Sequence, residues 1–366
     1  MREYLLTAFV VAAVTYLLTP LVRRLAETIG AYTPVRDRDV HTIPTPRLGG
    51  IAMFVGISAG LLVASHLPTL QRVFDTSEVR GVLFGGILLV AIGAADDRWG
   101  LDALTKLAGQ ILAAGVMVLQ GVQLLYLPLP GNTLSLSPNI GVPLTVIFVV
   151  VTINAVNFID GLDGLAAGVV AIAALAFFAY SYEISVVKHY DRAAPATLIT
   201  IVLAGACLGF LPHNFNPARV FMGDSGSMLL GLMLSAASVS LLGRLDPNNT
   251  ATAGFFPALL PLLLPLAVLA VPFMDLLLAV VRRTRSGQAP WEPDKLHLHH
   301  RLLRLGHSHA RAVLIMYLWS ALIAGAAVTV AFAHSRPYLV IAAYLGAGAV
   351  LLVASNIPRL RQQPRV

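Results

Sequence analysis

Four polar clusters interrupt an otherwise apolar chain, and the densest contains two carboxylates and two carboxamides within ten residues. It comprises Asn154, Asn157, Asp160 and Asp163. A helix would place the first three of these on one face, because they are spaced three residues apart, and Asp163 extends the row. Carboxylate and amide oxygens suit Mg²⁺ and the phosphates that it carries. Carboxylates at a membrane edge are functional-site candidates, and the alternative is a polar helix end that faces water.

A second cluster, Asp96 and Asp97, closes another apolar run. Adjacent carboxylates repel one another unless a cation or a proton lies between them. We therefore expect one of them to face a site and the other to face a structural partner such as Arg98. Lys106 follows within reach of the same pocket, and a solvated loop is the alternative.

A third cluster, residues 223–227, reads Gly-Asp-Ser-Gly-Ser and opens another apolar run, with Asn216 in the loop before it. A helix that begins there exposes N–H groups and the positive end of its dipole, which favours binding of an anion. The alternative is that Asp224 or Ser225 serves only as the N-cap of that helix.

Arg47 precedes the paired glycines Gly49 and Gly50 in the first polar loop. Such a turn could bring backbone N–H groups and a cation to a phosphate. The alternative is an ordinary positively charged turn.

The fourth cluster lies in the longest polar loop, residues 282–312, and contains His297, His299, His300 and Arg301. Three histidines in four residues could hold zinc. No cysteine accompanies them, however, and the oxygen-rich clusters elsewhere favour Mg²⁺. A basic lid over a pyrophosphate fits better, because imidazole and guanidinium groups both donate hydrogen bonds to phosphate oxygens.

Membrane-spanning helices must position these clusters. Hydrophobic residues make up 57% and charged residues 12% of the chain, whereas a soluble protein carries about 25% charged residues, and the mean hydropathy is +0.79. The apolar runs have about 20 residues, the length that crosses a hydrocarbon core as helix. We therefore expect an all-α integral membrane protein in which residues 1–366 form a single polytopic bundle of about eleven transmembrane helices. The expected spans are residues 4–22, 48–66, 79–95, 104–121, 142–158, 164–181, 195–212, 227–243, 254–281, 313–333 and 337–356.

The ninth expected span contains Pro257, Pro261, Pro265 and Pro272. Prolines kink a spanning helix and free its carbonyl groups, so a bent helix 9 could open a groove toward the lipid. The alternative is a kink with only a packing role. Cys207, the single cysteine, excludes internal disulfides and a thiolate metal site.

Eleven spans place the two termini on opposite sides of the membrane. The loops after spans 1, 3, 5, 7 and 9 and the C-terminal tail then share one side, which holds most of the 25 Lys and Arg residues. The positive-inside rule makes this side cytoplasmic. The polar clusters fall on the same side, so we expect a cytoplasmic active site and C-terminus and an external N-terminus. The net charge of +7 is then a consequence of membrane topology and not a sign of nucleic-acid binding.

Taken together, the four clusters resemble those of the polyprenyl-phosphate N-acetylhexosamine-1-phosphate transferases, glycosyltransferase family 4. The matching stretches occur in family order, and with the intervening spans they cover about residues 1–335. They are Asp96-Asp97, residues 154–165, residues 221–227 and residues 297–301.

Two branches of this family compete. The phospho-N-acetylmuramoyl-pentapeptide transferases of peptidoglycan synthesis have three consecutive histidines followed by Phe-Glu, whereas this chain has His-Leu-His-His-Arg at residues 297–301. Residues 44–50 also form a longer turn than in that branch. Both departures favour the branch that uses UDP-GlcNAc, with the peptidoglycan branch as the alternative.

The resemblance implies transfer of GlcNAc-1-phosphate from UDP-GlcNAc to undecaprenyl or decaprenyl phosphate, with release of UMP, at the bacterial inner membrane. It implies Mg²⁺, or Mn²⁺ in its place, bound through Asp224 with help from Asn157. It also places Asp96 at the prenyl phosphate, Asp97 in support and Lys106 near the substrate phosphates. Homodimers occur in this family.

The resemblance further assigns Asp160 and Asp163 to the nucleotide site, and His299, His300 and Arg301 to the diphosphate. Four more residues are expected to bind substrate: Arg47, Asn154, Asn216 and His297. A membrane transporter is the rival from another class, because it also has broken helices and intramembrane polar groups. Its site would lie near the membrane midplane between repeats, whereas these clusters lie at helix ends on one side.

Overall fold

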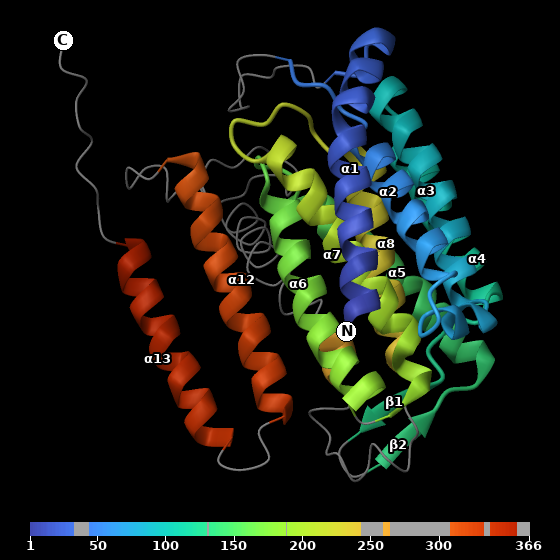
Figure 1. The fold of residues 1–366 in the computed structure, drawn as a ribbon, viewed down its shortest axis with the longest axis vertical. Helices are drawn as coiled ribbons and strands as arrows, with labels where there is room; N and C mark the ends of the chain where they lie inside the picture. Colours follow the sequence, from blue (N-terminus) through green and yellow to red (C-terminus); the bar gives the residue numbers. More distant parts are fainter. Residues whose placement is uncertain are drawn as a thin grey trace, which may run out of the picture.

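The computed structural model describes residues 1–32, 44–129, 132–187, 189–242, 259–263, 308–332 and 337–356. These residues form a bundle of long helices with one small β-hairpin (Figure 1). Within the part of the chain that the structure describes, seven helices are long and apolar enough to cross a membrane, and three further apolar helices are shorter. The expectation of an α-helical, polytopic membrane protein is confirmed.

Ten of the eleven expected spans coincide with a helix in the described residues. The ninth, residues 254–281, lies outside them except for a helical stretch at residues 259–263, so its expected kink also lies outside. The helices are α1 (Arg2–Ile29), α2 (Gly49–Ala64), α3 (Glu78–Trp99), α4 (Ala103–Leu119), α5 (Pro138–Ile159), α6 (Leu165–Tyr182), α7 (Ala194–Asn214), α8 (Gly223–Leu242), α12 (His309–Phe332) and α13 (Pro337–Asn356).

The helix ends differ from the expected spans in a way that matters for the polar clusters. Helix α3 continues to Trp99 and α8 already begins at Gly223. Asp96, Asp97 and Asp224 therefore lie in terminal helical turns and not in loops, and the rigid backbone of a helix holds each carboxylate.

A β-hairpin that the sequence analysis did not anticipate connects α4 with α5. Strands β1 (Tyr126–Leu129) and β2 (Asn132–Ser135) pair antiparallel, with Tyr126 opposite Ser135. Each strand has only four residues, which is too short for the alternation of a strand to stand out in a sequence of this hydropathy.

Helix α8 lies at the centre of the bundle and is buried from Ser225 to Leu242. It packs against α2, α3, α5 and α7, while α1 covers α2 and α7. Helix α6 packs on α7, α12 packs on α6, and α13 contacts α12 at the edge of the bundle (Figure 1). The element that begins with the Asp224 cluster is therefore the one that most other helices surround.

Small residues let the neighbouring helices approach the first turn of α8. A Cβ atom on Gly50 would lie 2.2 Å from the backbone nitrogen of Gly226, and one on Gly93 would lie 2.4 Å from the backbone of Ser225. Such close approach through glycine is a common way to pack helices in membranes. It brings the N-terminal turn of α2 and the C-terminal half of α3 directly against the start of α8.

Polar contacts join α3 and α8 at both ends of their antiparallel packing. At one end the carboxylate of Asp97 accepts hydrogen bonds from the start of α8. At the other end buried Glu78 accepts a hydrogen bond from Ser240. These contacts restrict sliding of α3 along α8.

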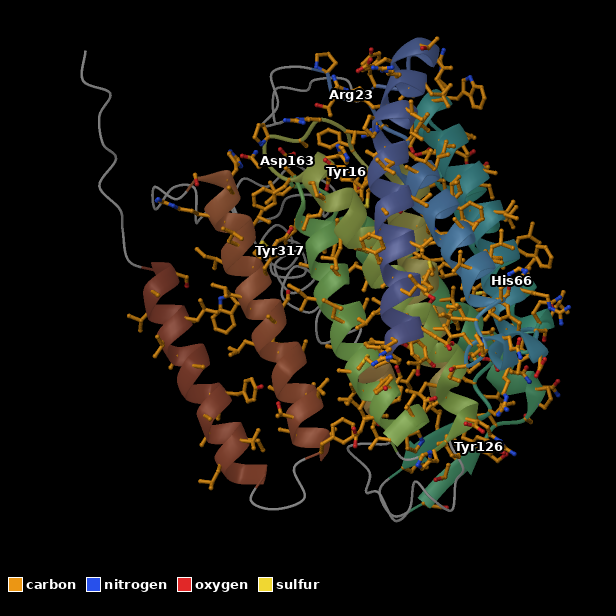
Figure 2. The ribbon with its side chains drawn as sticks, viewed as in Figure 1. Tyr16, Arg23, His66, Tyr126, Asp163 and Tyr317 are labelled. Atoms are coloured by element: carbon orange, nitrogen blue, oxygen red, sulfur yellow. The ribbon has the colours of Figure 1, made fainter. Side chains whose placement is uncertain are left out.

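Four loops meet at one end of the bundle. Phe221 donates a backbone hydrogen bond to Pro46 (2.8 Å), Ala218 donates to Asp163 (3.0 Å) and Asp224 donates to Asp97 (2.9 Å). The expected grouping of the loops after spans 1, 3, 5 and 7 is thus confirmed. The hairpin lies at the other end, as the labels of Asp163 and Tyr126 indicate in Figure 2.

Candidate active site

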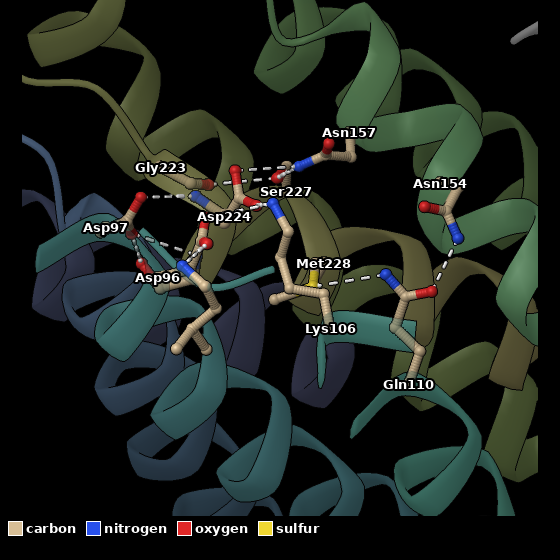
Figure 3. Close-up of polar contacts among 12 residues, drawn as sticks. Asp96, Asp97, Lys106, Gln110, Asn154, Asn157, Gly223, Asp224, Ser227 and Met228 are labelled. Atoms are coloured by element: carbon tan, nitrogen blue, oxygen red, sulfur yellow. Dashed lines mark hydrogen bonds and ion pairs between the residues drawn. The ribbon is translucent and has the colours of Figure 1, made fainter. Parts of the chain in front are cut away.

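The centre of the site is a lysine held between two carboxylates from different helices (Figure 3). Lys106 Nζ of α4 donates to Asp96 Oδ2 of α3 at 3.3 Å and to Asp224 Oδ2 of α8 at 3.0 Å. The other oxygen of Asp96, Oδ1, accepts from the backbone N–H of Leu101 at 2.7 Å. The side chains of Lys106 and Asp224 are 29% and 20% exposed, so a ligand can reach them.

Helix α5 contributes Asn157 to the same centre. Its Nδ2 donates to Asp224 Oδ1 at 3.2 Å and to Ser227 Oγ at 2.8 Å. Both oxygens of Asp224 therefore have a partner from a different helix. The sequence analysis did not single out Ser227, although it stands one turn after Asp224 and so faces the same way.

Asp97 performs a different task from its neighbour Asp96. Its Oδ1 accepts from the backbone N–H of Asp224 at 2.9 Å, and its Oδ2 accepts from Ser225 Oγ at 2.9 Å and from Ser225 N–H at 3.2 Å. The Asp97 side chain is 0% exposed, so it has no surface for a substrate. The sequence predicted a free anion site at the start of α8, but the Asp97 carboxylate already fills it.

Gly223 makes this cap possible. Its φ is +69°, which is costly for residues with a Cβ atom. A Cβ there would also lie 2.2 Å from Asp97 Oδ2. Only glycine lets the chain turn into α8 around the carboxylate.

The amides beside Arg47 are also unavailable to a phosphate, contrary to expectation. Gly49 N–H donates to Phe221 O and Gly50 N–H donates to Met222 O, both at 3.0 Å. The cation itself lies near the site, with Arg47 Nη1 3.9 Å from Asp97 Oδ1.

The row of polar side chains expected on one helix face, residues 154–163, is interrupted because the helix ends within it. Helix α5 stops at Ile159 and Asp160 is its C-cap residue, so only Asn154 and Asn157 of the row lie on α5. Burial and the nearby carboxylate of Asp224 raise the pKa of Asp160 to about 7, with Arg47 acting in the opposite direction. Asp160 therefore lies in the electrostatic field of the site.

Asp163 and Asn216 form a connection between two loops. Asp163 Oδ2 accepts from Asn216 Nδ2 at 2.9 Å and from Ala218 N–H at 3.0 Å. This ties the turn after α5 to the loop before α8. Asn214, which donates to Val220 O and accepts from Gly164 N–H, reinforces the same connection.

Asn154 lies apart from the acidic centre (Figure 3). Its Nδ2 donates to Gln110 Oε1 at 2.7 Å and to Val150 O at 2.8 Å. Gln110 was not anticipated, although a lone amide four residues after Lys106 in an apolar helix is a signal that could have identified it. The other expected residues, His297, His299, His300 and Arg301, lie outside the described residues.

The donors at the centre suit a hard divalent cation. Within the described part of the chain, no group of three or more His, Cys, Asp or Glu side chains could hold a metal by itself. Mg²⁺ commonly binds through one or two carboxylates and takes its remaining ligands from substrate phosphates and water. Asp96 and Asp224 converge on one cation, the ammonium of Lys106, so the charge and donor type at this place fit Mg²⁺.

Comparison with known proteins gives a consistent result. The family model described as Glycosyl transferase family 4 matches residues 79–242, which include helices α4 to α8 and all but the first residue of α3. The chain is 49% identical to a decaprenyl-phosphate N-acetylglucosaminephosphotransferase of Mycolicibacterium smegmatis, over 100% of this chain and 90% of that protein. It is 50% identical to the protein of the same name from Mycobacterium tuberculosis, over 99% and 90%. It is 31% identical to an undecaprenyl-phosphate alpha-N-acetylglucosaminyl 1-phosphate transferase of Haemophilus influenzae, over 87% and 85%.

Proposed function

The chain belongs to glycosyl transferase family 4, among the polyprenyl-phosphate N-acetylglucosamine-1-phosphate transferases, and from this premise we propose its reaction. It transfers GlcNAc-1-phosphate from UDP-GlcNAc to decaprenyl or undecaprenyl phosphate and releases UMP. The product is a lipid-linked first intermediate of a cell-envelope polysaccharide. The two relatives with about half of their residues identical carry decaprenyl phosphate in their names, which favours that acceptor.

The observation that carries this proposal is the convergence of Asp96, Lys106 and Asp224 from three helices at one end of the bundle. Phosphoryl transfer requires positioning and neutralisation of charge more than covalent help from the protein. A cation between two carboxylates, reachable from outside and at the end of membrane helices, suits a reaction between a soluble nucleotide sugar and a lipid phosphate.

Mg²⁺ would be held by Asp224 and Asn157, with Mn²⁺ as an alternative ion. When bound, the metal neutralises charge on the diphosphate and on the UMP leaving group. The carboxylate of Asp96 lies on the other side of Lys106 and would orient the lipid phosphate. Lys106 would pair with the phosphate oxygens through its ammonium group.

The transfer is a single in-line displacement in this proposal. An oxygen of the prenyl phosphate attacks the β-phosphorus of UDP-GlcNAc, and the bond to the bridging oxygen breaks as UMP departs. A phosphate monoester has a second pKa of about 6, so it is largely a dianion at neutral pH and needs little help from a base. Isolation of a phospho-sugar on Asp96 or Asp224 would contradict the single step.

The other expected residues surround this centre. Arg47 and Asp160 would contact the nucleotide, and Asp163 with Asn216 would hold the loop that faces it. His297, His299, His300 and Arg301 would bind the diphosphate from the long loop before α12. We further propose that this end of the bundle faces the cytoplasm of a bacterial cell, because most Lys and Arg residues belong to its loops.

The test is release of UMP by the purified protein in detergent with Mg²⁺ and prenyl phosphate. UDP-GlcNAc and UDP-MurNAc-pentapeptide are supplied separately, each with decaprenyl and undecaprenyl phosphate, and Asp224→Asn serves as the inactive, folded control. UMP from UDP-GlcNAc alone supports the proposal. UMP from the muramoyl donor alone assigns the protein to peptidoglycan synthesis. No UMP with either donor, from folded protein, rejects the reaction.

A further inference from the structure

A second polar layer lies one helical turn away from the Lys106 centre, and the proposed reaction does not use it. It consists of Gln110 on α4, Asn154 on α5 and Met228 on α8 (Figure 3). Gln110 Oε1 accepts from Asn154 Nδ2 at 2.7 Å, and Gln110 Nε2 donates to Met228 Sδ at 3.6 Å. Gln110 is 4% exposed, so it cannot contact a substrate in solution.

The two layers correspond residue by residue. Gln110 follows Lys106 by four residues, Met228 follows Asp224 by four, and Asn154 precedes Asn157 by three. Residues three or four apart lie on the same face of a helix. Each member of the second layer therefore supports, on the same helix, one member of the centre.

Helix α4 needs such support more than its neighbours do. It packs against α3 and α5 and exposes Leu104, Ile111, Leu112 and Leu119 on its outer face. Lys106 and Gln110 connect it by hydrogen bonds to α8. A lysine side chain is long and loses rotamer entropy when it is fixed, so its helix must be held in register for the ammonium to stay between two carboxylates.

We propose that Gln110 is a positioning residue that fixes the register of α4, and that Asn154 acts through Gln110 and not on the substrate. Both N–H donors of the Asn154 carboxamide have protein acceptors, Gln110 and Val150. The layer sets the position of Lys106 relative to Asp96 and Asp224. This inference rests on the proposed function for its kinetic test, so the experiment also includes a measurement that needs no activity.

The kinetic test is a double-mutant cycle on UMP release with Gln110→Met, Asn154→Leu and the double variant. Methionine matches glutamine in length but offers no amide. We expect each single variant to lower kcat by about tenfold, the effect of a lost buried hydrogen bond, with little change in KM. We expect the double variant to lose no more than either single one, because both remove the same contact. Gln120→Met, the same substitution at the opposite end of α4, is the matched control and should keep wild-type kinetics.

The second measurement follows the Lys106 amine itself, by its rate of reaction with an acylating reagent and mass spectrometry. We expect slow labelling in the wild type and in Gln120→Met, and several-fold faster labelling in Gln110→Met and Asn154→Leu, with every protein labelled well below its own melting temperature. The inference would be overturned if the double variant lowered kcat by the product of the two single effects. It would also be overturned if the rate of Lys106 labelling stayed at the wild-type value in the single variants. An inactive wild type with the expected labelling pattern would reject the proposed reaction and leave the positioning role standing.

Discussion

At the scale of single residues, the adjacent carboxylates Asp96 and Asp97 have different roles, because one faces the candidate active site and the other holds two helices together. Successive residues on a helix point about 100° apart, so Asp96 meets Lys106 while Asp97 meets the start of α8. Two different positively polarised partners, an ammonium group and a helix N-terminus, offset the repulsion between the two carboxylates. Their exposure also differs slightly, because the side chain of Asp96 is 9% exposed and that of Asp97 is 0% exposed.

Conversion of each carboxylate to an amide should separate these tasks. Asp97→Asn places an NH₂ group or a weaker acceptor against N–H donors and removes a charge from a helix N-terminus, so we expect a loss of about 1–3 kcal/mol in stability. Asp96→Asn should keep the wild-type melting temperature and abolish UMP release. Thermal unfolding in detergent, measured beside activity, checks both. An Asp97→Asn protein that melts like the wild type but is inactive would indicate direct contact with the substrate.

Asp160 gives a prediction for pH. Its pKa is raised to about 7 in the folded protein from its ordinary value of 3.8, so between these two pH values the folded state holds a proton that the unfolded chain has lost. The unfolding free energy contributed by this group is present below pH 4 and is lost as the pH rises through 7. In chelator, the wild type should therefore lose stability relative to Asp160→Asn between pH 4 and 8. Parallel profiles for the two proteins would contradict the raised pKa.

At the scale of helices, the site depends on how closely α2 and α3 approach the first turn of α8. Gly50 and Gly93 leave no room for a Cβ atom beside Ser225 and Gly226. The glycines therefore contribute to the reaction indirectly, because they set the distance at which the carboxylates of α3 and α8 can share Lys106.

Gly93→Ala tests this packing. The added methyl would overlap the Ser225 backbone, and overpacking of this kind costs about 1–3 kcal/mol. We expect a lower melting temperature and at least a tenfold fall in UMP release, because α3 must move away from α8. Gly115→Ala on α4, where a Cβ meets nothing within 4 Å, is the matched control and should retain both properties. If the two variants had equal melting temperatures and equal rates of UMP release, the close approach of α3 to α8 at Gly93 would not be required.

At the scale of the whole molecule, helices α1 to α8 alternate in direction. The loops that carry Arg47, Asp163 and Asn216 therefore meet at one end of the bundle, and the hairpin lies at the other. This arrangement makes the membrane topology testable with two cysteines. Cys207 is buried, and its replacement by alanine gives a cysteine-free background.

In that background, Arg98→Cys lies at the site end and Asn132→Cys lies in the hairpin; both positions are exposed. We expect a membrane-impermeant maleimide to label Asn132→Cys in intact cells or spheroplasts. It should label Arg98→Cys only after the membrane is permeabilised. The reverse pattern would place the site outside and would contradict the positive-inside assignment.

The sequence by itself determined the membrane class, the approximate limits of ten helices, the grouping of four loops at one end and the family. These follow from hydropathy, the spacing of charges and short motifs, all of which are local or additive along the chain. The donor types at the site were also predictable, because Asp96, Lys106, Asn157 and Asp224 each belong to a recognisable cluster.

Only the tertiary structure decided which of these groups meet. The amides of Gly49, Gly50, Asp224 and Ser225 were expected to be available to phosphate, but they are used within the protein. Asn154 donates a hydrogen bond to Gln110, and Asp97 accepts one from the first turn of α8. The physical reason is that a buried polar group must find a partner, and that partner is chosen by helix packing between segments far apart in sequence.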